Sequence, residues 1–452
     1  MEQATISGRR ATPAGARTPP GSRLPGIVQG VRYSRDPVGF FVDLNRRYGD
    51  LFMVRFPYFG DVAYVAGPEL VKQVFTGSAS RFHAGEANAT VLEPQLGPHS
   101  VLTLDEDEHL RQRKLLLPPF HGERVRRYGE VMREMTERDI DSWPVGEPFA
   151  LRAHTEKITL AVILHAVFGV RDEERFRRAS ELTGEFVRAS HLITGFPMLR
   201  RNLGRFSPWE RFKRARAALD SFIYAEIAAR RAELDADAES ERDDVLSLLL
   251  QASDDEGNAM TDREVRDELV TIVGAGHETT ATALAWAMER LLRTPRVMER
   301  LRESISAGED EYLDATIRET LRIRPVIVDV ARKLTEPTEI GGYELEAGTF
   351  VLPAIAAMHY REDLYPEPEE FRPERFLDGG ADTYVWIPFG GGVRRCIGAA
   401  FAQYEMRVVL RTILERTDLR APDPAPEKLK IRNITLAPGR GARVVQDRPP
   451  EL

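Results

Sequence analysis

The segment from Thr261 to Pro295 predicts one unusually long helix, which constrains the fold more than any other part of the chain. Its first residues, Thr-Asp-Arg-Glu, fit a capping box, in which the Thr and Glu side chains bind the free N–H groups at a helix start. Apolar residues then recur at helical spacing as far as Leu291, and Pro295 is expected to end the helix. A helix of about 33 residues at 1.5 Å per residue extends roughly 50 Å. It therefore crosses a whole domain.

The middle of this helix has an unusual composition, GAGHETT, over Gly274–Thr280. Each glycine costs up to about 1 kcal/mol in a helix interior. One interpretation is packing, in which a neighbouring element comes close and needs small residues. The other is a chemical site, because Glu278 and Thr279 place a carboxylate and a hydroxyl in one turn.

The rest of the chain is mostly helical in pattern, over Pro68–Trp143 and again over Ala153–Arg231. Val54–Val65 predicts two short strands with a turn at Tyr58–Asp61, and Arg332–Leu352 predicts further short strands separated by glycine turns. The chain shows no alternation of strands and helices, which disfavours a doubly wound parallel sheet. We therefore expect a mainly α fold with a minor β region drawn from both ends of the chain.

Composition excludes several classes of protein. The 452 residues include 63 Lys and Arg against 71 Asp and Glu, a net charge of −8, which argues against binding nucleic acid by bulk charge. Apolar runs such as Thr159–Val170 are shorter than the roughly 20 residues of a membrane span, so we expect no transmembrane anchor and a cytoplasmic location. We interpret residues 1–25, with four arginines and four prolines, as a flexible basic tail, and residues 26–452 as a single domain.

The only cysteine, Cys396, lies in a glycine-rich, cationic loop directly before an apolar helical segment. A single cysteine excludes intrachain disulfides and zinc sites that need several thiolates. Glycines Gly390–Gly392 would let backbone N–H groups crowd around the sulfur, and the following helix start adds a positive dipole end. With Arg394 and Arg395, these features predict a lowered thiol pKa. The residues alone leave open an inert core cysteine, a nucleophile or a metal ligand, although no Cys–His arrangement is recognisable.

Four motifs, in matching order and spacing, resemble those of the cytochrome P-450 family, soluble bacterial type, from about Pro25 to the C-terminus. The cysteine loop matches the signature Phe-x-x-Gly-x-Arg-x-Cys-x-Gly at Phe389, Gly392, Arg394, Cys396 and Gly398. The middle of the long helix resembles the oxygen-activating motif, as Ala275-Gly276-His277-Glu278-Thr279-Thr280. Glu319–Arg322 resembles the family's Glu-x-x-Arg pair, and Phe371–Phe376 resembles the segment that carries its meander arginine.

The resemblance implies the cytochrome P-450 fold, a triangular helical domain with the long helix over a haem b and small mixed or antiparallel sheets. Cys396 is then the axial thiolate of the haem iron, within a loop that includes Phe389 and Gly398. Arg394 pairs with a haem propionate. His109 and Arg113 lie on one helix face and are two further propionate donors, unless that helix is simply a basic surface helix. Arg332 is a weaker propionate candidate.

The resemblance also implies the remaining roles. Glu319, Arg322 and Arg375 form a buried, structural charge network. Thr279 holds a water and donates a hydrogen bond to dioxygen, and Glu278 relays protons from solvent. This pair favours a monooxygenase that inserts one atom of O2 into its substrate. The alternative is a thiolate-haem protein that binds a ligand or gas without turnover.

The expected substrate is lipophilic, such as a fatty acid, terpenoid or steroid-like molecule, and it is hydroxylated or epoxidised. Its pocket is expected to be lined mainly by apolar side chains: Leu92, Ala275, Val326, Ile327, Val328, Ile434 and Leu436. Electrons are expected from a separate ferredoxin or flavodoxin with its reductase. The protein is expected to be a monomer that binds no nucleic acid. A basic docking surface for the donor is predicted near the cysteine, from Arg111, Lys114, Arg124, Arg126, Arg127, Arg395 and Arg407.

Overall fold

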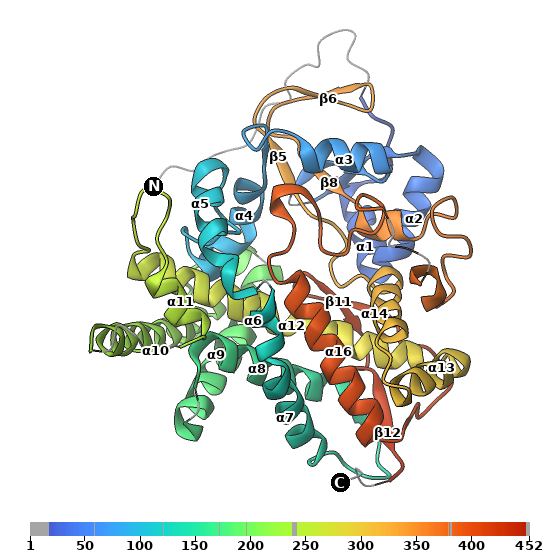
Figure 1. The fold of residues 1–452 in the computed structure, drawn as a ribbon. Coiled ribbons are helices and arrows are strands. Elements are labelled where there is room, and N and C mark those ends of the chain that lie inside the picture. The colour runs from blue at the N-terminus through green and yellow to red at the C-terminus, as the bar shows by residue number, and fades with distance from the viewer. Residues whose placement is uncertain are drawn as a thin grey trace.

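The computed structural model describes residues 18–57, 59–120, 122–170, 172–195, 197–236, 242–377, 379 and 382–448. Helix α12, Asp262–Leu291, runs through the middle of the molecule behind α16, Ala399–Arg416 (Figure 1). The predicted capping box is confirmed, because the Thr261 hydroxyl accepts from the Glu264 N–H while the Glu264 carboxylate accepts from the Thr261 N–H. The predicted C-terminus was too late. The helix ends at Leu291, and Pro295 is the first residue of the next helix.

Helices make up most of the described chain, as expected. The other α-helices are α1 (Gly26–Arg35), α2 (Pro37–Tyr48), α3 (Pro68–Thr76), α4 (Ala84–Leu96), α5 (Glu106–Leu116), α6 (Glu123–Arg127), α7 (Gly129–Ile140), α8 (Leu151–Phe168), α9 (Glu173–Gly195), α10 (Pro208–Ala236), α11 (Val245–Gln251), α13 (Pro295–Ser306), α14 (Glu311–Ile323) and α15 (Ile355–His359). Short 3-10 turns cover Pro118–Phe120, Pro197–Leu199, Pro373–Phe376 and Gly392–Arg394.

A five-stranded sheet joins the two ends of the chain, in the order β1-β2-β8-β5-β3. Its strands are β1 (Leu51–Phe56), β2 (Gly60–Val65), β3 (Phe82–His83), β5 (Arg332–Leu334) and β8 (Phe350–Pro353). The two strands expected over Val54–Val65 are β1 and β2, which pair antiparallel with Leu51 opposite Val65. β1 begins three residues earlier than expected, and Gly60 and Asp61, expected in the turn, already belong to β2, while Tyr58 lies outside the described residues. β2 runs parallel to β8, with Val62 opposite Phe350, so early blue and late orange segments lie side by side (Figure 1). The expected sheet from both ends of the chain is confirmed.

The remaining strands form three small sheets. β6 (Thr338–Ile340) pairs with β7 (Tyr343–Leu345), and β10 (Leu429–Arg432) pairs with β11 (Thr435–Pro438), both antiparallel. β12 (Arg443–Gln446) lies between β4 (Phe149–Ala150) and β9 (Leu419–Arg420).

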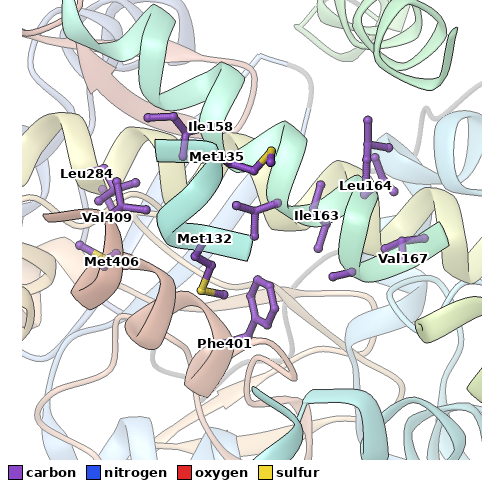
Figure 2. Packing of buried hydrophobic residues seen from close by; sticks show 14 of the residues in the cluster. Met132, Met135, Ile158, Ile163, Leu164, Val167, Leu284, Phe401, Met406 and Val409 are labelled. Carbon is purple, nitrogen blue, oxygen red and sulfur yellow. The ribbon is translucent and has the colours of Figure 1, made fainter. Parts of the chain in front are cut away.

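The main core forms where α7, α8, α12 and α16 meet, and Figure 2 shows side chains of these helices converging, with Met132 of α7 beside Phe401 of α16. α8 is held directly to α12, because the Thr155 and Thr159 hydroxyls donate to carbonyl oxygens of α12 at 2.9 and 3.0 Å. Gly276 permits this approach. A Cβ there would lie only 3.0 Å from the end of the Ile163 side chain.

The chain contacts strand β1 before residue 26. The Met53 N–H donates to the Pro20 carbonyl at 2.8 Å, and Gly21 forms a parallel bridge with Met53. Of the expected tail, residues 1–17 lie outside the described part of the chain. Within the described part, no single helix has the length and apolar composition to cross a membrane. Only the bent pair Leu151–Phe168 and Glu173–Thr194 meets those criteria together.

Candidate functional site

A cavity of about 780 Å³ lies between the cysteine loop and the middle of α12. Most of the residues expected at the site line it: Leu92, His109, Arg113, Ala275, Thr279, Val326, Ile327, Val328, Arg332, Phe389, Arg394, Cys396, Gly398 and Ile434. Two expected residues, Glu278 and Leu436, are not among its lining residues. The fold thus brings together residues from nearly the whole length of the chain around one space.

The cysteine loop is shaped by its contact with α3. Gly390 and Gly392 adopt left-handed backbone angles, with φ of 66° and 64°, which favour glycine. A Cβ on Gly391 would lie 2.3 Å from the Phe75 ring, and one on Gly392 would lie 1.9 Å from the Phe75 carbonyl oxygen. The loop closes where the Cys396 N–H donates to the Phe389 carbonyl at 3.0 Å. These glycines therefore make room for α3, which the sequence analysis did not foresee.

The Cys396 thiol borders the cavity and is exposed to it. Burial raises its pKa above the ordinary value for a thiol. The Gly398 N–H, Arg113 and Arg395 all favour the thiolate, but they do not outweigh this desolvation. The predicted lowering of the thiol pKa is therefore wrong for this structure, because the sequence pattern shows the nearby dipoles and charges but not the burial.

Four basic side chains gather along one wall of the cavity. Arg394 donates to Asp105 at 2.5 Å and to the Leu104 carbonyl at 2.7 Å. Arg332 is buried, and its only hydrogen bond within the described chain is to the adjacent Ala331 carbonyl, at 2.8 Å. Burial is the main cause that lowers the pKa of both arginines to about 10.

The other two basic residues, His109 and Arg113, come from α5 and both line the cavity. His109 is 2% exposed, so its part of α5 is not a basic surface face. Burial, followed by Arg394 and Arg113, lowers the pKa of His109 to about 3, which keeps the imidazole neutral at pH 7. The three arginines and Asp105 then leave two positive charges. The wall suits a ligand that carries two carboxylates.

Thr279, on α12, also lines the cavity. Its hydroxyl donates to the Ala275 carbonyl one turn earlier, at 2.7 Å. Ala275 and Gly276 also line the cavity, so the small residues of this turn leave space beside the hydroxyl. Gly276 therefore serves both interpretations of the GAGHETT segment, as a packing contact for α8 and as part of the site.

Glu278 points away from this space. Its carboxylate lies 3.5 Å from Arg152 on α8 and 3.4 Å from both the Asn433 amide and the Thr435 hydroxyl. Arg152 is buried and also pairs with Glu156 at 2.8 Å. Sequence reasoning missed Arg152, because nothing in its own segment indicates a distant partner.

The predicted charge network forms in the structure. Glu319 and Arg322 are both 0% exposed and form two hydrogen bonds of 2.7 Å, and Arg375 lies 3.5 Å from Glu319. Arg322 also donates to the His359 carbonyl at 2.8 Å. The His359 Nε2 in turn accepts from the Ile387 N–H at 3.1 Å, two residues before Phe389. His359, which the sequence analysis did not identify, thus links this network to the loop.

Leu436 supports the wall without lining it. It is 1% exposed, its N–H donates to the Val326 carbonyl at 2.8 Å, and its carbonyl accepts from the Trp286 indole at 2.7 Å. All four residues of β11 are buried, so Leu436 lies in the core beside the cavity.

The chain is similar to known proteins over nearly its whole length. The family model described as Cytochrome P-450 matches residues 18–442. The provisionally named cytochrome P-450 135B1 of Mycobacterium tuberculosis (strain ATCC 25618 / H37Rv) is 42% identical over 432 residues, covering 94% of this chain and 90% of the relative. The provisionally named cytochrome P-450 138 of Mycobacterium bovis (strain ATCC BAA-935 / AF2122/97) is 38% identical over 440 residues, covering 96% and 98%.

Two solved structures have the same fold. The structure titled "Retinoic acid bound cyanobacterial CYP120A1" superposes with a TM-score of 0.82 at 24% identity, covering 95% of this chain and 99% of that one. The cytochrome P-450DA heme domain gives a TM-score of 0.80 at 23% identity, covering 96% and 99%.

Proposed function

This chain belongs to the cytochrome P-450 family and is a haem-dependent monooxygenase, and from that premise we propose that it hydroxylates or epoxidises a lipophilic substrate. The observation that carries the proposal is the apolar part of the cavity wall, which includes Leu92, Val326, Ile327 and Ile434. Apolar walls bind a substrate by removing its hydrocarbon surface from water. We further propose that residues 26–452 act as one domain, since strands from both ends share a sheet.

The residues around the cavity fit a haem. The group carries two propionates, and the wall of Arg113, Arg332, Arg394 and His109 supplies donors and a surplus of two positive charges. Cys396 is the thiol that borders the same space, and we propose it as the iron ligand, with Phe389 and Gly398 shaping its loop. When bound, a thiolate-ligated haem supplies the reduction of dioxygen and the transfer of one oxygen atom.

We propose that Thr279 positions a water in the cavity. Its hydroxyl has one proton, which it donates to the Ala275 carbonyl in this structure, and its oxygen can still accept from a water. When the hydroxyl turns toward the cavity, it becomes the donor that delivers a proton there.

We propose that Glu278 resupplies this proton. The partly exposed Glu156 pairs with the buried Arg152, and Arg152 in turn contacts Glu278 of α12. Ionisable groups therefore extend from the surface to the residue before Thr279. The Glu278 carboxylate can take a proton from water on the Arg152 side, and it delivers this proton when its side chain turns from Arg152 toward the cavity. These two groups favour turnover over the simple binding of a ligand or gas.

As a member of its family the enzyme uses O2, a substrate and a redox partner, and we propose that the partner is a separate acidic ferredoxin or flavodoxin. The structure narrows the predicted docking surface, because four of its basic residues pair with carboxylates: Arg111 with Asp254, Lys114 with Asp255, Arg127 with Asp243, and Arg407 with Asp314. Arg124, Arg126 and Arg395 form no ion pair within the described residues. Docking through these three would make reduction slower as ionic strength rises.

The experiment that tests the function uses the purified holoenzyme with a reductase and ferredoxin. Lipophilic compounds are first screened for a substrate-induced change in the haem spectrum, and those that bind are incubated with reductant and O2. We expect oxygen consumption and a product heavier by one oxygen atom. Binding without any oxidised product, across fatty acids, terpenoids and steroids, would contradict the proposed substrate class.

A further inference from the structure

A second polar group lines the cavity, and none of the roles above uses it. Asp329 follows the wall segment Val326–Val328, and Tyr64 of β2 donates its phenol proton to the Asp329 carboxylate at 3.1 Å. Tyr33 of α1 also lines this part of the cavity. The carboxylate therefore lies in a wall made by α1, β2 and the segment after α14.

The surroundings of Asp329 are aromatic. The Tyr33 ring packs against Phe56 at 5.5 Å, edge to face, and the Tyr64 ring lies 4.6 Å from Phe41. Desolvation raises the pKa of Asp329 to about 6, while the hydrogen bond from Tyr64 lowers it. With that pKa, most of the carboxyl groups are ionised at pH 7.

This carboxylate has no counter-charge in the described part of the chain. No Lys, Arg or His there forms an ion pair with it, and Tyr64 is its only side-chain hydrogen-bond donor. The carboxylate at the basic wall differs from Asp329 in this respect, because Asp105 pairs with Arg394. A buried charge without a partner is unfavourable unless something that enters the site compensates it.

The chemistry of the entering group follows from this imbalance. A hydroxyl could satisfy a lone pair of the carboxylate but not its charge. A carboxylate, such as the head group of a fatty acid, would be repelled. An ammonium ion satisfies both the charge and the hydrogen bonds, and the rings of Tyr33, Tyr64 and Phe56 suit a cation attached to an apolar body.

We propose that the substrate of this enzyme is a lipophilic amine, which binds as its ammonium ion with the charge held at Asp329. The inference rests on the proposed function and deepens it, since it names the polar end of the lipophilic substrate. Asp329 is then the residue that determines specificity, and Tyr64 orients its carboxylate through the 3.1 Å hydrogen bond.

The test uses the holoenzyme and three probes with the same chain: dodecyltrimethylammonium, dodecan-1-ol and dodecanoate, each below its micelle concentration. The quaternary nitrogen has no lone pair, so it cannot bind the haem iron and confuse the spectrum. It also has no N–H group, so this probe tests the charge of the substrate and not its hydrogen bonds. Affinities are measured from the spin-state change and by calorimetry. In the unchanged protein we expect the ammonium probe to bind tightest and dodecanoate weakest, with a gap of about tenfold or more between ammonium and alcohol.

Variants locate the effect at Asp329. Asp329→Asn is expected to lower the affinity for the ammonium probe by about tenfold. The affinity for dodecan-1-ol should change by less than about twofold. Asp329→Glu keeps the charge and should keep the preference for the ammonium probe. Glu344→Gln, at an exposed position on β7, makes the same change in net charge away from the cavity and should alter no affinity.

An unchanged ammonium affinity in Asp329→Asn, with normal haem content, would overturn the proposal. So would an alcohol that binds the unchanged protein as tightly as the ammonium probe, and this second result needs no variant to fold. Failure of the proposed function is separate. It would be seen as probes that bind without yielding oxidised product, whereas oxidation of dodecan-1-ol with no ammonium preference would overturn only the inference about Asp329.

Discussion

The Glu278 carboxylate lies 3.5 Å from the Arg152 guanidinium, which also binds Glu156 at 2.8 Å and so joins α12 to the partly exposed side of α8. The side chains of Glu156, Glu278 and Arg152 are 36%, 12% and 4% exposed. The arrangement gives the inner carboxylate a polar connection toward solvent that ends one residue before Thr279.

Replacing the inner carboxylate tests this connection. Glu278→Gln keeps the shape of the side chain but cannot carry a proton, so we expect product formation to slow by about a hundredfold and its solvent deuterium isotope effect to increase. Substrate binding, measured from the haem spectrum, should be preserved. Glu156→Gln is the matched control, with a smaller effect because water reaches that position directly. A Glu278→Gln enzyme with the original rate would remove this residue from proton delivery.

The hydroxyl of Thr279 should control coupling. Thr279→Ala is expected to bind haem and substrate and to consume O2, but most of the reducing equivalents should appear as hydrogen peroxide instead of product, because proton delivery is mistimed. Product and peroxide per reducing equivalent are measured together. Thr279→Ser retains the hydroxyl and should retain coupling. If alanine, a better helix former, leaves coupling unchanged, Thr279 is only a packing residue.

The single cysteine allows a direct test of the iron ligand. Cys396→Ser should abolish the thiolate-type carbon monoxide spectrum of the reduced protein, since no other cysteine exists to replace it. Circular dichroism and haem content check that the variant still folds and binds haem. A serine variant that kept this spectrum would disprove the assignment.

The buried pair Glu319–Arg322 should matter for stability. Arg322→Leu leaves the Glu319 carboxylate without its main partner in a site that is 0% exposed, so the free energy of unfolding should fall by about 3–5 kcal/mol. Denaturant unfolding of the holoenzyme measures it. The double variant Glu319→Leu, Arg322→Leu removes the stranded charge and should recover part of the loss. A single variant as stable as the unchanged protein would contradict the role of this network.

The buried His359 is expected to lower the free energy of unfolding in acid. Burial lowers its pKa to about 3, and its Nε2 accepts a proton from the Ile387 N–H only while the ring is neutral. The unfolded chain binds this proton near pH 6.5, so the group favours the unfolded state as pH falls from about 6.5 toward 3, with a slope of about 1.4 kcal/mol per pH unit. His359→Gln should have a shallower slope in unfolding experiments over that range. An unchanged slope would mean that other groups govern acid unfolding.

Much of the architecture could be predicted from local patterns. The capping box at Thr261, the strands around residues 54–65 and the mainly helical class depend on neighbours in the chain, and the structure confirms them. The spacing of His109 and Arg113 put both on one helix face, and both line the cavity. The end of the long helix was predicted three residues too late, because a proline can begin the next helix as readily as it ends the previous one.

By itself, the sequence determined the family, the single thiol beside a helix start, and the carboxylate–hydroxyl pair in the long helix, because each is a short pattern with a local geometry. Only the tertiary structure decided that burial raises the pKa of Cys396, that Arg152 is the partner of Glu278, and that Leu436 lies behind the cavity wall. The same holds for the unpaired carboxylate of Asp329 inside the cavity. The physical reason is that burial and pairing depend on which distant segments meet when the chain folds, and no local pattern contains that information.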